Sequence, residues 1–355
     1  MAGNSGIVRS LRANGTVRWF TNLNSPVQNR APVINVNGSN TIFVTSQDGW
    51  VTALNAETGF LNWHSDLGES VVAGVAYQPN VATIMGPRNL IFAGTFNNDS
   101  TLDPNKLVAF DANSTTTGDV VWTFLGTVTA TMGIMPTTPA VDYASNTIFF
   151  GTNTPSNGPG SRGVWAVNTT NGIIRWVNTT IGGVTNSAPT ISPDGQTLYI
   201  GTVNGTTFTL YALRTSDGSV RASFTAPAGV GDFRGSPWAQ SVGGGVVHMY
   251  TVAGDRVYAF SDSGGTGTLP FKPGWNAGYI TVPGAGTPLV FQQRGHLYVG
   301  GNNGDLYKVN LADGTITNRV YFDAPAAVSD VTYDRIRNAF YVTSNGRIYS
   351  IKGDW

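Results

Sequence analysis

A unit of sequence returns along the whole length of this chain, at a spacing of roughly 45–60 residues. Each unit contains, in order, a small residue with Pro, an opening strand, an aromatic-rich strand, a strand with Ala near its end, and Gly followed four residues later by Trp. The clearest copy consists of Ala31-Pro32-Val33, Thr41–Thr45, Trp50–Leu54, Gly59 and Trp63. One such unit cannot bury its own apolar faces, so successive copies must pack against one another.

The aromatic-rich strand returns in six further copies, at Leu90–Gly94, Thr147–Gly151, Leu198–Gly201, Val246–Tyr250, His296–Gly300 and Ala339–Thr343. These strands are continuous β-branched and aromatic runs, which is typical of strands covered on both faces. No stretch of ten residues has the apolar spacing of an amphipathic helix. The sequence therefore predicts an all-β fold, a single β-propeller domain over residues 1–355 with seven four-stranded blades.

The last unit lacks its outer strand, and the beginning of the chain supplies one. Gly15 and Trp19 have the spacing of an outer strand, whereas the chain stops soon after Ile348–Ile351. We expect this N-terminal strand to complete the C-terminal blade, because a closed ring leaves no exposed strand edge. The segment Ile7–Leu11 resembles an additional third strand, so eight blades with a truncated last unit are the alternative.

The Gly and Trp of each unit are expected to be structural docking residues. They occur as Gly15 with Trp19, Gly59 with Trp63, Gly118 with Trp122, and Gly172 with Trp176. The glycine permits a tight turn, and the large ring is expected to lie over the neighbouring blade while its N–H finds an acceptor. Two units depart from this pattern, with Ala222 and Asn318 in place of Trp.

Composition excludes several classes of function. Basic and acidic residues number 20 each, and no basic run exceeds two residues, which disfavours nucleic-acid binding. No apolar stretch is long enough to span a bilayer, so membrane insertion is not expected. Cysteine is absent, which excludes disulfides and a cysteine nucleophile. The low charged fraction, 11%, and abundant Asn and Thr favour a secreted or cell-surface location, with a cytoplasmic one as the alternative.

The segment from Ala53 to Trp63 resembles the pyrroloquinoline quinone (PQQ) repeat, and the segment from Ala166 to Trp176 is similar to it. The resemblance extends over almost the whole chain and implies a propeller. The family includes quinoprotein dehydrogenases and also binding proteins without a cofactor. Its alcohol dehydrogenases have a vicinal disulfide and a calcium ion near a catalytic Asp. This chain has no cysteine, and its acids are scattered one or two per unit, mostly in turns, so PQQ with calcium is disfavoured and neither cofactor nor metal is expected.

Three residues of one connection are the first candidates for ligand binding. Asp232, Arg234 and Trp238 lie just before and within an opening strand, where loops of a propeller converge. They could form a polar clamp with an aromatic floor for a small ligand or sugar. The alternative is a local ion pair beside a structural Trp.

Two further residues are weaker candidates. Met132 belongs to a Met-containing loop that could form an adaptable contact surface, with filling of the interior as the alternative. Asp330 replaces the Pro that precedes the opening strand in five other units, so its carboxylate could face the axis, or else serve a turn or bind water. Trp275 lies in a loop that either exposes an aromatic ring or forms an irregular outer strand. His64, His248 and His296 lie in different units, which argues against a metal site.

These observations favour a secreted or cell-surface propeller that binds a protein or a glycan and performs no chemistry. The alternative from another class is a divergent PQQ-type oxidoreductase or a lyase, with Asp232, Arg234 and Asp330 at the channel mouth. A third possibility is a structural module of a longer protein or filament.

Overall fold

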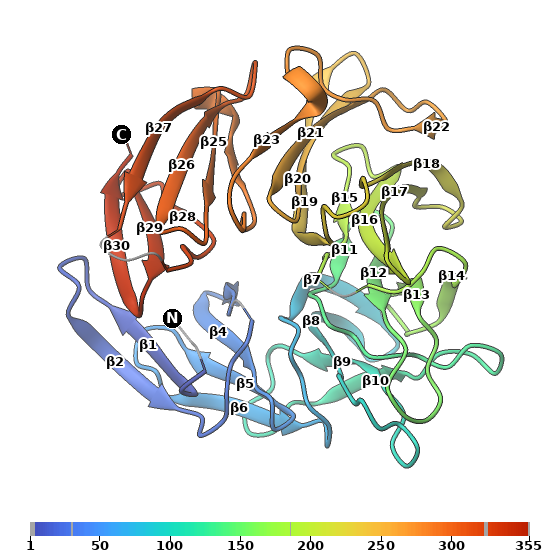
Figure 1. Ribbon diagram of the computed structural model, residues 1–355. Helices are drawn as coiled ribbons and strands as arrows, with labels where there is room; N and C mark the ends of the chain where they lie inside the picture. Colours follow the sequence, from blue (N-terminus) through green and yellow to red (C-terminus); the bar gives the residue numbers. More distant parts are fainter. Residues whose placement is uncertain (1–3, 30, 185, 323–325, 354–355) are drawn as a thin grey trace. The chain divides into compact units, whose positions relative to one another are not determined.

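The computed structural model describes residues 4–29, 31–184, 186–322 and 326–353, and they form strands and turns with almost no helix (Figure 1). The fold is that of a seven-bladed β-propeller with four-stranded blades, as the repeat predicts. The chain divides into two compact units, Met1–Thr185 and Asn186–Trp355, which are described separately below. The expectation of a single domain over residues 1–355 stays a prediction.

The described part of the N-terminal unit contains one hairpin and three four-stranded antiparallel sheets, each built from strands that are consecutive in the chain. The hairpin consists of β1 (Ile7–Leu11) and β2 (Val17–Asn22). The sheets consist of β3 (Val33–Val36), β4 (Ser39–Thr45), β5 (Trp50–Asn55) and β6 (Leu61–Asp66); β7 (Ala76–Thr83), β8 (Gly86–Gly94), β9 (Leu107–Asp111) and β10 (Val120–Phe124); and β11 (Ala140–Asp142), β12 (Thr147–Thr152), β13 (Gly163–Asn168) and β14 (Ile174–Asn178).

The described part of the C-terminal unit contains four sheets. The first consists of β15 (Thr190–Ile191), β16 (Thr197–Asn204), β17 (Thr207–Arg214) and β18 (Val220–Thr225), with β22 (Gly267–Thr268) as a fifth strand. The second consists of β19 (Phe233–Gly243), β20 (Val246–Ala253), β21 (Arg256–Asp262) and β23 (Tyr279–Thr281), which follows the 3-10 helix η1 (Asn276–Gly278). The third consists of β24 (Leu289–Phe291), β25 (His296–Gly300), β26 (Asp305–Asn310) and β27 (Ile316–Tyr321), with η2 (Gln292–Arg294) after β24; the last consists of β28 (Thr332–Asp334), β29 (Ala339–Ser344) and β30 (Arg347–Lys352).

The two ends of the chain pair locally. Strand β2 pairs with β1, and the C-terminal sheet has the order β28-β29-β30. The closure expected from the sequence would join the N-terminal outer strand to that last sheet, and hence strands of the two units, so it stays a prediction.

As the sequence predicts, the middle strands of the sheets are the most deeply buried. Every residue of β9 and β12 is buried. Outer strands alternate instead, as in β6, because only one of their faces meets the following sheet. The core therefore lies between neighbouring sheets, where aromatic and β-branched side chains from both faces interdigitate.

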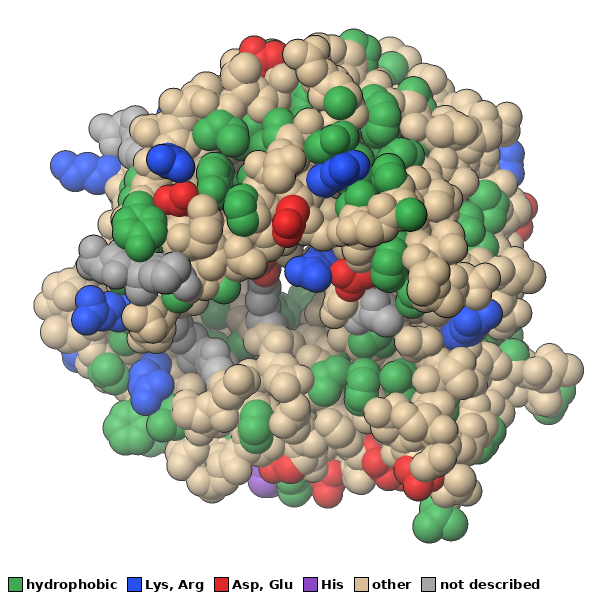
Figure 2. Space-filling model, viewed as in Figure 1, with side chains coloured by type: hydrophobic (Ala, Val, Ile, Leu, Met, Phe, Trp, Pro, Cys, Tyr) green, Lys and Arg blue, Asp and Glu red, His purple; other side chains and the backbone are tan. Residues whose placement is uncertain are grey.

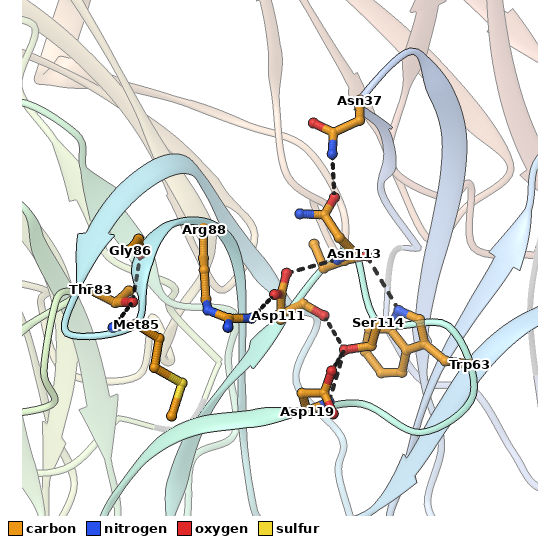
Figure 3. A network of polar contacts seen from close by, with 11 residues as sticks. Asn37, Trp63, Thr83, Met85, Gly86, Arg88, Asp111, Asn113, Ser114 and Asp119 are labelled. Atoms are coloured by element: carbon orange, nitrogen blue, oxygen red, sulfur yellow. Dashed lines mark hydrogen bonds and ion pairs between the residues drawn. The ribbon is translucent and has the colours of Figure 1, made fainter.

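Trp63 shows how one sheet is joined to the next (Figure 3). Its side chain is 1% exposed, and its ring centroid lies 6.0 Å from that of Phe110 in the following sheet. The indole Nε1–H donates to the carbonyl oxygen of Ala112 at 3.3 Å. A Cβ atom at Gly118 would lie 2.7 Å from the ring, so the glycine of one unit leaves space for the tryptophan of the unit before it.

The other docking residues vary this arrangement. The indole N–H groups of Trp19 and Trp122 donate to the backbone carbonyls of Ala56 and Thr169, and the two rings cover Gly59 and Gly172. Trp176 is buried, with its ring centroid 5.8 Å from that of Phe149. Gly15 lies in an open turn with φ of +82°. Gly118 is therefore needed for space and Gly15 for its backbone conformation, whereas Gly59 and Gly172 are needed for both, since their φ angles are +76° and +71°.

A polar network beside Trp63 fastens the turn that follows β9 (Figure 3). The Asn37 amide donates to the Asn113 side-chain oxygen at 3.0 Å, which links the β3–β4 turn to the next sheet. Asp111 is paired with Arg88 and accepts the Asn113 backbone N–H at 3.0 Å. These contacts hold the Ala112 carbonyl in the position where Trp63 reaches it.

Trp275 is a docking residue that the sequence did not identify. Its side chain is 5% exposed, its Nε1–H donates to the Leu311 carbonyl at 3.0 Å, and its ring covers Gly314. The possibility that this ring is exposed to a partner is therefore wrong. The residue stands just before η1, and Phe271 occupies the position four residues before it where the other units have Gly, so the spacing rule could not find it.

A buried ion pair stands at the sheet that has Ala222 instead of a docking tryptophan. The Arg221 guanidinium donates through two nitrogens to Asp262, with the Nη1–Oδ1 distance 3.0 Å. The Tyr199 hydroxyl donates to Asp262 Oδ2 at 2.6 Å. Strand β22 pairs in parallel with β18 at Ala222, so the segment after β21 covers the edge of the preceding sheet. Polar contacts and a fifth strand therefore replace the missing indole.

The same pair predicts a dependence of stability on acid. Burial raises the pKa of Asp262, but hydrogen bonds from Arg221, Tyr199 and the Gly264 amide, together with the Arg221 charge, outweigh it and lower the pKa. An Asp whose pKa is lowered by folding contributes stability above its unfolded-state pKa, about 3.9, and loses it as pH falls through the folded-state value. We expect the difference in free energy of unfolding between the natural chain and Asp262→Asn to shrink as pH falls from about 6 to about 2.

Urea denaturation at each pH measures this difference. Acids elsewhere in the chain are the same in both proteins and cancel. A difference that stayed constant with pH would contradict the assignment of an ionised, hydrogen-bonded Asp262.

Candidate functional site

The ion pair predicted in the connection before β19 is present. The Nε–H of Arg234 donates to Asp232 Oδ1 at 3.0 Å, and the side-chain amide of Asn186 donates to Asp232 Oδ2. The Arg234 side chain is 48% exposed, whereas Asp232 is mostly covered. The Arg234 guanidinium is therefore exposed to solvent, while the Asp232 carboxylate is held by Arg234 and Asn186.

Backbone contacts hold this connection against the preceding sheet. Gly235 donates its N–H to the Asn186 carbonyl at 2.8 Å, and the Ala188 N–H donates to the Gly235 carbonyl at 3.1 Å. Gly231 and Gly235 have φ of +102° and +64°, a conformation that glycine adopts without strain. The segment that carries Asp232 and Arg234 is thus fixed as part of a sheet edge.

Trp238 follows on the same strand. Arg234, Ser236 and Trp238 are the exposed positions at this end of β19, separated by partly or fully buried residues. The pairing of β19 with β20 is irregular between Arg234 and Trp238, and Trp238 stands opposite Tyr250. Trp238 is 39% exposed, so a large aromatic surface accompanies the Arg234 cation.

Asp330 is brought toward this group by Thr287. Asp330 Oδ1 accepts the backbone N–H of Thr287 at 2.8 Å. The Thr287 side chain fills the space beside Gly235, where a Cβ atom would come within 2.1 Å of its Oγ1. The segments that lead into β15, β19, β24 and β28 therefore meet, and we call the set Asn186, Asp232, Arg234, Trp238, Thr287 and Asp330 the inner-strand rim.

Met132 does not belong to an exposed surface. It is 0% exposed and lies in the core of the N-terminal unit with Phe92, Trp122 and Met135. This placement agrees with the alternative interpretation, in which Met132 fills the interior. A methionine in a loop is compatible with either role, because its flexible side chain fills irregular gaps as readily as it forms surfaces.

Sequence reasoning missed Asn186 and Thr287. Thr287 stands immediately before Pro288, and Asn186 stands three residues before Pro189. A polar residue within three positions before the opening Pro of a unit is a signal that could have found them. Their convergence depends on sheet packing.

The expectation that the chain binds neither PQQ nor calcium stays a prediction, and the described residues can be compared with what calcium requires. Calcium takes six to eight oxygen ligands, usually with several carboxylates. No group of three or more His, Cys, Asp or Glu residues that could hold a metal occurs within residues 4–29, 31–184, 186–322 and 326–353. Asp232 and Asp330 accept hydrogen bonds from this chain's own donors, and Arg234 places a cation beside Asp232.

Two of the histidines are partly buried. Burial lowers the pKa of His248 and, as the largest contribution, that of His296; nearby Lys272 and Lys308 act in the same direction. Both are therefore biased toward the neutral form at neutral pH. Neither belongs to the inner-strand rim.

The surface is weakly charged. Figure 2 shows one face, on which Lys and Arg side chains are scattered among polar and hydrophobic atoms without gathering into a basic patch. Among the described residues, no helix has the length and apolar character needed to cross a membrane.

Four-stranded sheets joined by Gly and Trp contacts define the chain as a propeller of the PQQ-repeat class. The family model described as "Outer membrane protein assembly factor BamB" matches residues 4–187, just over half of the chain, and the chain belongs to this family.

Solved structures with the same fold are distant in sequence. BamB from Moraxella catarrhalis is 18% identical with a TM-score of 0.65, over 98% of this chain and 91% of that one. Quinohemoprotein alcohol dehydrogenase from Comamonas testosteroni is 14% identical with a TM-score of 0.67, over 96% and 68%. The computationally designed Ika8 protein is 12% identical with a TM-score of 0.52, over 92% and 96%. No curated protein matches the sequence significantly. These similarities establish the fold.

Proposed function

We propose that this protein is a non-catalytic, secreted or cell-surface propeller that binds a protein partner at the inner-strand rim. The observation that carries the proposal is that Arg234 and Trp238 are both exposed at the same end of β19, on a segment fixed by hydrogen bonds. Arg and Trp are the residue types that most often dominate binding energy at protein interfaces. The family's description as an assembly factor supports a role in holding other proteins.

Rigidity of the rim supports binding further. Asp232 is held by Asn186 and Arg234, and Asp330 by the Thr287 amide, so little conformational entropy remains to be lost when a partner docks. Arg234 retains guanidinium nitrogens beyond the Nε that binds Asp232, and these suit a carboxylate or a backbone carbonyl of a partner. We therefore expect an acidic or polar segment of a protein at Arg234, with an apolar group against Trp238.

The second candidate is a divergent oxidoreductase or lyase that uses Asp232, Arg234 and Asp330. The two carboxylates lie on segments that Thr287 brings together, which favours it. General acid or base catalysis requires a carboxylate free to exchange a proton with substrate. The ion pair and amide contact at Asp232 oppose such a role.

Site-specific photo-cross-linking in the cells that make the protein tests this proposal. A benzoylphenylalanine at position 238 is expected to give a discrete protein adduct, and Arg234→Glu in the same chain is expected to reduce its yield at least about tenfold, through loss of a charge-assisted contact. The matched control places the probe at Ile336, an exposed position in the turn after β28, and no adduct of that mass is expected there.

Equal adducts at positions 238 and 336, or none at 238, would remove the rim as a protein-binding site. Loss of the adduct on addition of soluble glycans would indicate a glycan partner instead. Dye-linked oxidation of an alcohol or sugar on addition of PQQ and calcium would establish the enzyme.

A further inference from the structure

A cavity of about 240 Å³ lies in the N-terminal unit, between the end of β2 and one face of the β3–β6 sheet. Thr21 and Asn22 line it on the β2 side, and Trp50, Thr52 and His64 line it on the sheet side. The Trp50 and His64 rings stack at a centroid distance of 4.4 Å. The cavity is smaller than the roughly 300–1,000 Å³ of sites for drug-sized ligands, so it suits one small ring.

The repeat explains why space is left here. Thr52 precedes Ala53, and the residue before the equivalent Ala is Trp165, Tyr211 or Tyr258 in three other units. At two other junctions between sheets, an aromatic ring from the preceding outer strand packs on that large side chain. These pairs are Phe124 with Trp165, at a centroid distance of 5.7 Å, and Phe224 with Tyr258, at 5.2 Å.

The equivalents of both partners are small at the junction between β2 and the β3–β6 sheet. Thr21 stands two residues after Trp19, as Phe124 stands two residues after Trp122. Thr21 and Thr52 therefore replace two aromatic rings, while Trp19 still docks on Gly59 and Thr21 Oγ1 still donates to the Gly59 carbonyl at 2.6 Å. The junction is intact and the space inside it is open.

The lining has the chemistry that recognises a neutral sugar. The Trp50 ring and the Leu61 side chain offer apolar surface, which suits the C–H face of a pyranose. Asp48 offers a carboxylate, and its position is set by Ser46, whose hydroxyl donates to Asp48 Oδ1 at 2.6 Å. Hydroxyl and amide groups of Thr21, Asn22 and Thr52 complete the polar lining. Asp48 is the acid in this lining and no Lys or Arg accompanies it, so anionic ligands are disfavoured.

We propose that this cavity binds one neutral hexose ring, with Trp50 as the apolar platform and Asp48 as the acceptor for its hydroxyl groups. This site involves none of the residues of the inner-strand rim, so it stands or falls independently of the proposed partner.

Calorimetric titration of the full chain tests the proposal, with glucose, galactose, mannose and N-acetylglucosamine as probes. Saturable binding of at least one of them is expected. Thr52→Tyr restores the large side chain found at this position in other units, and it is expected to weaken binding at least about tenfold without lowering the denaturation midpoint. Asp48→Asn is expected to weaken binding by a similar factor of about ten.

The matched control is Asp194→Asn. Asp194 accepts from Ser192 in the same kind of turn as Asp48, but it lies outside the cavity, so binding is expected to be unchanged. Methyl glycosides distinguish the source of the ring, because the end of a glycan must bind as a glycoside whereas a free sugar need not. The proposal is overturned if none of the four sugars binds or if Thr52→Tyr binds them as well as the natural chain does. It is also overturned if the cation choline binds to the cavity and no sugar does.

Discussion

Replacement of Arg221 by alanine is expected to lower the free energy of unfolding by about 3–5 kcal/mol, the loss typical when one partner of a buried ion pair is removed. Arg221 and Asp262 are both buried, and the substitution leaves the Asp262 carboxylate without its two guanidinium hydrogen bonds. Tyr199 would remain as its side-chain donor. An uncompensated buried charge is unfavourable because the low-dielectric interior cannot replace its hydration.

Chemical denaturation of the variant and the natural chain measures this loss. Arg214→Ala is the control, since Arg214 lies in the same sheet but is exposed, and about 0–1 kcal/mol is expected for it. The double substitution of Arg221→Met with Asp262→Leu is expected to recover much of the stability, because apolar residues of similar size often replace a buried pair without loss. A loss below about 1 kcal/mol for Arg221→Ala would show that this pair does not replace the missing tryptophan.

Replacement of Trp63 by alanine is expected to lower the free energy of unfolding by about 3–5 kcal/mol. The ring is enclosed by Phe43 in its own sheet and Phe110 in the next, at centroid distances of 5.9 and 6.0 Å. Its removal leaves a cavity at the junction of two sheets and an Ala112 carbonyl without its indole donor. The control is Trp238→Ala, for which a change within about 1 kcal/mol is expected, because that ring is partly exposed.

The receiving glycine tests the same contact from the other side. Gly118 has no left-handed φ, so the loss expected for Gly118→Ala, about 1–3 kcal/mol, comes from its collision with the Trp63 ring. When Gly118→Ala is made in a chain that already carries Trp63→Ala, most of that loss in free energy of unfolding should disappear. Equal losses in the two backgrounds would show that space for the ring is not what position 118 requires.

The blades could be predicted from sequence because their signals are local and repeated. Thr41–Thr45 and Trp50–Leu54 were predicted as strands, and β4 and β5 occupy Ser39–Thr45 and Trp50–Asn55. Several units carry the same order of buried strand, turn glycine and docking ring, so one recognised copy predicts the others. The pair of Asp232 and Arg234 was likewise predictable, because two residues of opposite charge stand close together in the chain.

Replacements for a missing part of the repeat were not predictable. Ala222 showed that a tryptophan is absent, yet the ion pair that stands there joins Arg221 to Asp262, which is remote in sequence. Trp275 docks from a segment that lacks the usual glycine spacing. Thr287 became part of the rim only through contacts with Gly235 and Asp330.

The amino-acid sequence alone determined the all-β class and the order of strands that is repeated along the chain, since the period of buried residues and turn glycines is a property of neighbours along the chain. Tertiary structure decided which side chains meet between the sheets: the Arg221–Asp262 pair, the rim around Asp232, and the open space between Thr21 and Thr52. The physical reason is that these contacts depend on how two faces pack, and packing responds to the volumes of residues far apart in the sequence.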